Sequence, residues 1–180
     1  MYLLKIYACL VLTILLILPR AKVQSGNDVQ RSQQFRVTIP RRLFISSPGS
    51  VPLQEYPGDG AADIHFTEES WTIGNNTRNG ATVLIETQSA FQHLDNAASK
   101  RDAQLEVTVT DASGPGTWSV DVPSATTDYT QGDETARVRV KANGPGSATV
   151  KLKVTFLTGA PETLQEGDYT ATVVGTIAEN

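Results

Sequence analysis

The chain has 180 residues, of which 39% are hydrophobic and 19% are charged. This length and composition predict one soluble domain and argue against two. The formal net charge of −4 argues against binding of nucleic acid through bulk charge, because proteins that do so carry basic surfaces that neutralise phosphates.

The N-terminal 25 residues have the layout of a secretory signal peptide. Lys5 precedes an uncharged apolar run from Ile6 to Leu18, which Pro19 closes. The run is shorter than the ~20 apolar residues that a membrane span needs. We therefore predict that residues 1–25 are a leader cleaved after Ser25, with an uncleaved anchor as the alternative. The mature protein is expected to be secreted, periplasmic or at the cell surface, with no membrane span.

Cleavage would change the charge and the cysteine content of the chain. Three of the 15 Lys and Arg residues would leave with the leader, so 12 would remain against 19 Asp and Glu, a net charge of −7. The only cysteine, Cys9, would leave as well. The mature chain would then have to fold outside the cell without disulfides, and a hydrophobic core suffices for that at this length.

The first part of the mature chain divides into an arm, a strand and a loop. Residues 26–34 are polar and have no period, so they are predicted to form a flexible N-terminal arm, and residues 35–180 a single domain. Phe35, Val37 and Ile39 alternate with polar residues and predict a first strand, which Pro40 interrupts and residues 43–45 continue. Residues 46–62 are rich in Pro and Gly and predict a long surface loop.

The rest of the chain alternates between apolar and polar residues, which is typical of short strands with one buried face. We expect these strands at residues 64–66, 71–73, 81–87, 105–109, 118–122, 137–141, 149–156 and 169–177. The pair Asn79-Gly80 predicts a turn before residue 81. Only Ser89 to Asp102 has helical spacing, so one or two helical turns are expected there.

About eight or nine short strands separated by Gly and Pro are typical of an all-β protein. The two last strands each have one apolar face, which a second sheet must cover. We therefore predict an all-β fold, a two-sheet antiparallel β-sandwich with an Ig-like or pilin-like arrangement and at most one short helix.

Two loops of the chain resemble each other. Residues 111–120 align with residues 141–150, and both segments contain Gly-Pro-Gly. The strands that leave the loops agree in phase, Val120 with Val150, whereas the strands that enter them do not. We interpret the pair as two similar loops and not as a duplicated domain.

A basic stripe is the one predicted surface that departs from the average. Its residues are Arg137, Arg139, Lys141, Lys151 and Lys153. If the two strands that carry it form a hairpin, Arg139 faces Lys151 and Arg137 faces Lys153, and opposed like charges destabilise a sheet. Either a carboxylate such as Glu106 or Asp121 offsets these charges, or the stripe is a docking face for an acidic partner, which would be another surface protein or an acidic glycan.

Catalytic, cofactor and metal-binding motifs are absent from the sequence. His65 and His93 lack the spacing of a zinc site, and there is no Gly-x-Ser-x-Gly. The acidic loops at 59–63 and 128–134 have the oxygens that calcium prefers, but turn chemistry explains them equally well. We predict no catalytic, cofactor or metal residue. A hydrolase with two carboxylates far apart in sequence is the least favoured alternative.

Aromatic residues bear on a further alternative, a carbohydrate- or ligand-binding module. An exposed Trp71, Trp118 or Tyr129 beside polar groups would favour it. Both tryptophans are in phase with apolar neighbours, so we expect them in the core. Asn75-Asn76-Thr77 has the pattern of a glycosylation acceptor.

The segment Gly167-Asp168-Tyr169-Thr170-Ala171-Thr172-Val173-Val174-Gly175-Thr176-Ile177 resembles the closing strand of secreted bacterial β-sandwich proteins of the pilin and spore-coat-protein-U type. The leader, the short polar arm and the Thr-rich strands are similar in style. The resemblance implies a surface or structural protein of the kind often assembled by donation of an N-terminal strand to a neighbour. We therefore expect a bacterial protein with a structural or adhesive role and no enzymatic activity.

Overall fold

The computed structural model describes residues 30–58 and 62–180. The predicted leader with Cys9, the first part of the predicted arm, and residues 59–61 of the acidic loop lie outside the described residues. Ile39–Asn180 form one compact unit, which contains all the described strands.

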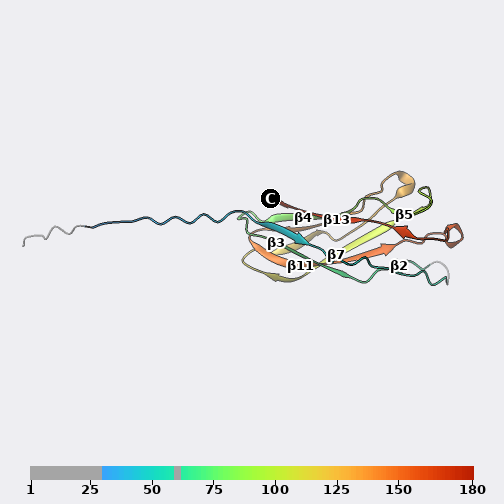
Figure 1. Ribbon diagram of the computed structural model, residues 1–180, viewed down its shortest axis with the longest axis horizontal. Helices are drawn as coiled ribbons and strands as arrows, with labels where there is room; N and C mark the ends of the chain where they lie inside the picture. Colours follow the sequence, from blue (N-terminus) through green and yellow to red (C-terminus); the bar gives the residue numbers. More distant parts are fainter. Residues whose placement is uncertain (1–29, 59–61) are drawn as a thin grey trace, which may run out of the picture. The chain divides into compact units, whose positions relative to one another are not determined.

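Antiparallel strands make up this unit (Figure 1). The largest sheet has the order β1-β3-β11-β7-β9, with β2 paired to β11 beyond the start of β3. Its strands are β1 (Leu43–Ser46), β2 (Ile64–His65), β3 (Glu69–Asn75), β7 (Ala103–Ser113), β9 (Ser124–Thr126) and β11 (Gly146–Phe156). A second sheet has the order β13-β4-β10-β8, and its strands are β4 (Ala81–Thr87), β8 (Trp118–Val122), β10 (Arg137–Ala142) and β13 (Val173–Glu179).

One cluster of buried residues lies between these two sheets. Ile73, Val150 and Leu105 come from the larger sheet, while Val83 and Val138 come from the smaller one. Figure 1 shows β4 and β13 in one layer and β7 and β11 in the other, and each pair is hydrogen-bonded side by side. The predicted all-β fold of antiparallel sheets is confirmed, and the shared core is what a β-sandwich requires.

A third, small sheet closes one end of the unit. Its order is β12-β5-β6, and its strands are β5 (Phe91–His93), β6 (Lys100–Arg101) and β12 (Tyr169–Thr170). The only helices among the described residues are the single 3-10 turns η1 (Tyr129–Gln131) and η2 (Pro161–Thr163). This sheet has its own buried cluster, built around Phe91, Ala103 and Phe156.

The helical turns predicted within Ser89 to Asp102 are wrong, because this segment forms β5 and β6 joined by a turn. Phe91 and His93 are buried while Gln92 between them is partly exposed, which is the period of a strand. The helical spacing depended on Leu94, whose side chain is exposed. The buried faces of β5 thus determined the local structure, and helix propensity did not.

The first predicted strand is only partly correct. Residues 43–45 belong to β1, as expected, but residues 35–39 are not in a strand. Phe35, Val37 and Ile39 are 82%, 85% and 79% exposed. The segment has the alternating pattern of a strand, yet among the described residues it pairs with no sheet.

The two Gly-Pro-Gly loops lie against each other and connect the two sheets. One leads from β7 to β8 and the other from β10 to β11, so each carries the chain from one sheet to the other. The backbone N–H of Gly116 donates to the carbonyl oxygen of Pro145 at 2.7 Å. A Cβ on Gly116 would lie 2.4 Å from the carbonyl oxygen of Gly144, so only glycine allows this approach. The interpretation as two similar loops agrees with this contact.

Candidate functional site

The site that stands out is an apolar groove at the end of the core where β1 stops. It has a cavity volume of about 1110 Å³. Its apolar walls include Ile64, Phe66, Trp71, Phe91, Phe156 and Tyr169. The groove therefore reaches from β2 and β3 of the larger sheet to β5 and β12 of the small one.

A series of aromatic rings, each in contact with the next, forms the floor of the apolar groove. Phe66 stacks on Phe91 with ring centroids 5.8 Å apart, and Phe91 meets Phe156 edge-on at 5.1 Å. Phe156 in turn meets Tyr169 at 5.4 Å, and Tyr169 meets His93 at 5.1 Å. Such pairs fix ring positions, so the floor is a preformed apolar surface.

The backbone beside the apolar groove is an unpaired sheet edge. β1 pairs with β3 only from Thr72 to Asn75. The last residue of β1, Ser46, lies opposite Thr72. Among the described strands, none pairs with residues 64–71 on that side, because β2 and the rest of β3 pair only with β11. An unpaired edge presents N–H and C=O groups that another extended chain can join.

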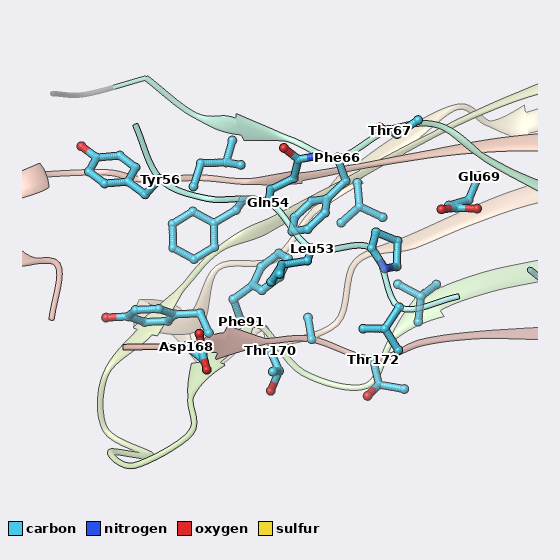
Figure 2. Close-up of a pocket in the computed structure, with 18 of the residues that line it drawn as sticks. Leu53, Gln54, Tyr56, Phe66, Thr67, Glu69, Phe91, Asp168, Thr170 and Thr172 are labelled. Atoms are coloured by element: carbon cyan, nitrogen blue, oxygen red, sulfur yellow. The ribbon is translucent and has the colours of Figure 1, made fainter. Parts of the chain in front are cut away.

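The strap, which we define as residues 47–56, lies over the apolar groove. Figure 2 shows Leu53, Gln54 and Tyr56 of the strap together with Phe66 and Phe91 among the lining residues. Within the described part of the chain, the strap makes no hydrogen bond. Its Val51 and Leu53 are 92% and 85% exposed. Pro48 and Pro52 lack an N–H, so the strap cannot act as a regular sheet strand.

Carboxylates lie on the wall and rim of the apolar groove. Glu69 pairs with the buried Leu152 in the sheet, and directly paired residues share a face, so the Glu69 side chain is on the inner face. Among the described ion pairs, none involves Glu69. Glu166 and Asp168 also line the groove. Figure 2 shows Glu69 and Asp168 at opposite ends of the view, so these two do not form the facing pair that a hydrolase would need.

Residues 30–42 have the opposite character, because they contain four arginines and no acidic residue. The arginines are Arg31, Arg36, Arg41 and Arg42. Arg41 is paired with Glu179, and the guanidinium of Arg42 lies 5.5 Å from the ring centroid of Phe44. The exposed apolar residues of this segment and its positive charge match an apolar groove with acidic walls.

The predicted basic stripe is divided between two sheets. Arg139 was expected to face Lys151 and Arg137 to face Lys153, and this prediction is wrong because β10 pairs with β4 and β8 while β11 pairs with β3 and β7. The hairpin failed because the loop at Gly144 crosses between the sheets.

Each cation of the stripe has a local partner. Arg139 and Lys141 contact Asp121 at 2.5 and 3.1 Å, Arg137 contacts Glu86 at 2.7 Å and Lys153 contacts Glu106 at 3.0 Å. Lys151 donates to the hydroxyl of Ser70 at 2.7 Å. The offsetting carboxylates Glu106 and Asp121 are therefore confirmed, and the docking of an acidic partner stays a prediction.

Two exposed carboxylates have a lowered pKa. Hydrogen bonds from Lys141 and then Arg139 hold the pKa of Asp121 below its ordinary value of 3.8. A hydrogen bond from the Thr130 hydroxyl is the main cause that lowers the pKa of Asp128. Asp128 also caps η1 by accepting from Gln131, so this acidic loop uses its oxygens in turn formation.

The aromatic residues considered as a sugar platform do not form one. Trp71 and Trp118 are both buried in the main core, as predicted. Tyr129 is half-buried in η1. In the folded domain the acceptor residue of the glycosylation pattern, Asn75, is buried, and its Nδ2 donates to the carbonyl oxygen of Gly144.

The two histidines have separate structural surroundings. His65 lies on the outer side of β2, 3.0 Å from the hydroxyl of Thr155. His93 is buried, with Nε2 2.8 Å from the carbonyl oxygen of Glu166 and Nδ1 accepting from the N–H of Asp95. Over residues 30–58 and 62–180, no group of three or more potential metal ligands occurs. None of the helices in these ranges is long and apolar enough to cross a membrane.

Sequence reasoning missed the apolar groove because its parts come from distant segments. The signal that was available is the break in alternation between Phe66 and Glu69, together with the proline-rich loop before it. Comparison of the chain with protein-family models, with curated proteins and with solved structures gave no match. The site therefore has to be interpreted from its own geometry.

Proposed function

We propose that this protein is a secreted or cell-surface structural or adhesive subunit, and that the extended segment at residues 31–39 of one copy occupies the apolar groove of another. The observation that carries the proposal is that one chain contains both an exposed apolar segment and a groove of matching character. An unpaired segment exposes Phe35, Val37 and Ile39 on one phase, and an apolar groove beside an unpaired sheet edge can accept such a segment.

The apolar side chains of the segment are the main source of binding free energy in this proposal. Burial of a Val, Ile or Phe side chain contributes about 1.5–3 kcal/mol relative to exposure. Three such side chains, together with backbone hydrogen bonds to the edge at residues 64–71, would offset the cost of ordering the segment, which is about 1–2 kcal/mol per residue for the backbone. The strap cannot supply the same bonds, because it contains prolines.

The segment joins its own domain at the end of β1 that is far from the groove. Pro40 and Arg42 are fixed to Asn76, whose Nδ2 donates to the carbonyl oxygen of Pro40 at 2.9 Å and whose Oδ1 accepts from the N–H of Arg42 at 2.6 Å. β1 then runs from its pairing with Asn75 to Thr72, about 13 Å, before the groove begins. A segment folded back at Pro40 would first run beside β1, whereas the segment of another copy can enter the groove directly.

Deletion of the segment tests the proposal. The chain from Gly26 to Asn180 is expected to self-associate in light scattering after size-exclusion chromatography, whereas a chain that begins at Pro40 should remain monomeric. The truncated chain keeps every described strand and both buried clusters, so it should retain the circular dichroism spectrum of the longer chain. A matched control changes Phe35, Val37 and Ile39 to Ser in the full mature chain, and it should also be monomeric.

Monomers of both forms at high concentration, with no binding of a peptide of residues 30–42 to the truncated chain, would overturn the proposal. Association that persists after the truncation would also overturn it, because the contact would then lie elsewhere on the domain.

A further inference from the structure

We infer that the strap is a clamp, which closes over the segment inserted from another copy and contacts it through Val51 and Leu53. This inference rests on the proposed function. It adds a second wall to the apolar groove, and it names the two side chains of that wall that hold the inserted segment in place.

The strap faces the apolar groove without filling it. Val51 and Leu53 line the same cavity as the aromatic floor, yet they are 92% and 85% exposed. A loop that plugged the groove would bury these side chains, because burial of a Val or Leu is favourable. The cavity that the strap and the floor share has a volume of about 1110 Å³. Pockets of about 300–1,000 Å³ already bury most of a small ligand, so an extended chain has room beneath the strap.

The strap is anchored at its two ends and not in its middle. It follows directly on β1. Beyond its other end, Thr158 donates its hydroxyl to the carbonyl oxygen of Ala62 at 2.8 Å and its N–H to Oδ1 of Asp63 at 2.9 Å. Of the strap residues only Pro48 and Tyr56 are half-buried, and the rest are exposed. A segment with so few buried contacts changes position at a low cost in free energy.

The charges of the apolar groove agree with residues 31–39 as the occupant over which the strap closes. Among the described lining residues three are carboxylates, Glu69, Glu166 and Asp168, and none is Lys or Arg. Residues 30–42 carry four arginines and no acidic residue. Opposite charges on the two sides favour this pairing and disfavour acidic chains.

Closure should act mainly on the dissociation of the inserted segment. The aromatic floor is preformed, so the segment can dock on it before the strap moves. Val51 and Leu53 then lose their contact with solvent only in the associated state. Contacts that form after docking slow dissociation more than they speed association.

Substitution of the two side chains tests the inference in the full mature chain. Val51→Ser combined with Leu53→Ser is expected to weaken self-association about tenfold in sedimentation experiments, with most of the change in the dissociation rate. Both side chains are exposed in the single subunit, so this variant should keep the melting temperature of the natural chain. Glu55→Ser is the matched control, because Glu55 is an exposed strap residue that does not line the groove. The control should change the affinity less than about threefold.

Limited proteolysis gives a second readout that needs no change in the strap. Chymotrypsin cleaves after leucine, and Leu53 is exposed in the single subunit. Cleavage follows the population of the open form, so it should slow about tenfold or more at concentrations where the natural chain is associated. The chain with Phe35, Val37 and Ile39 changed to Ser, at the same concentration, is the control and should be cleaved at the rate of the monomer.

The inference is overturned if the variant at 51 and 53 associates as tightly as its control. It is also overturned if association leaves cleavage after Leu53 unchanged or accelerates it, since acceleration would mean that the inserted segment displaces the strap. In those cases self-association of the natural chain would still support the proposed function, whereas a natural chain that stays monomeric would overturn both.

Discussion

The side-chain oxygen of Asn75 accepts two hydrogen bonds from Thr77, one from its backbone N–H at 3.0 Å and one from its hydroxyl at 2.8 Å. The Nδ2 of the same residue donates to the carbonyl oxygen of Gly144 at 3.2 Å. One buried side chain thus joins the end of β3 to the loop between β10 and β11. The turn after β3 and the crossing loop are therefore held by a shared residue.

Asn75→Ala should lower the free energy of unfolding by about 2–4 kcal/mol, because it removes the partner of the buried Thr77 N–H and of the Gly144 carbonyl oxygen, while the Thr77 hydroxyl keeps the carbonyl oxygen of Gly80. Urea denaturation followed by tryptophan fluorescence measures this loss. Asn79→Ala is the control, since the side chain of Asn79 makes no hydrogen bond within the described residues. Equal midpoints for the two variants would contradict the role of Asn75.

Gly175→Ala should destabilise the protein by about 1–3 kcal/mol through overpacking. A Cβ at Gly175 would lie 2.5 Å from the ring of Trp71 and 2.6 Å from Cδ1 of Ile45. Thermal unfolding measures the effect, with Gly49→Ala as the control because a Cβ there meets no atom within 4 Å. The natural chain and Gly49→Ala should have equal melting temperatures, and Gly175→Ala should have a lower one. A Gly175→Ala variant as stable as the control would show that Trp71 can move aside.

The protein should become less stable in acid as the carboxylate of Asp121 is protonated. Its pKa is lower in the folded state than in the unfolded chain, because Lys141 and Arg139 donate hydrogen bonds to the ionised carboxylate. The ionised form therefore stabilises the fold above the unfolded pKa, and this contribution is lost as the pH falls through the folded pKa. Asp121→Asn should lower the urea midpoint at about pH 6 and have little effect at about pH 2.5, relative to the natural chain at each pH.

Glu68→Gln is the control for this experiment, because among the described ion pairs none involves Glu68. It should leave the midpoint nearly unchanged at both values. A difference between Asp121→Asn and the natural chain that is the same at both pH values would assign the effect to packing and not to ionisation.

Much of the fold was predictable because strands with one buried face can be recognised by the alternation of apolar and polar residues. Val138 and Val140 alternate with arginines, and their burial follows the prediction. The failures have a common cause, which is that local pattern does not specify the partner strand. The β10–β11 hairpin was wrong because Gly144 lies in a crossing between sheets, a property of the whole core. The spacing from Phe91 to Leu94 fits a helix, whereas that from Phe91 to His93 fits a strand, and tertiary burial decided between them.

The candidate site was less predictable than the fold. Phe66, Phe91 and Tyr169 are ordinary apolar residues in the sequence, and only pairing of distant strands brings their rings together. The inward position of Glu69 depends on the irregular link between β2 and β3, which shifts the phase of alternation. Alternation of Phe35, Val37 and Ile39 was visible in the sequence, but their lack of a partner strand was not.

The strand order also governs when the fold can form during synthesis. β4 lies between β10 and β13, and both of these partners follow it by a long stretch of chain. Until the last strand, Val173–Glu179, has been made, one edge of β4 has no neighbour and the core between the sheets stays open. Such non-local pairing delays folding to the end of translation. A chain with this order can close its core only after its last strand has been made.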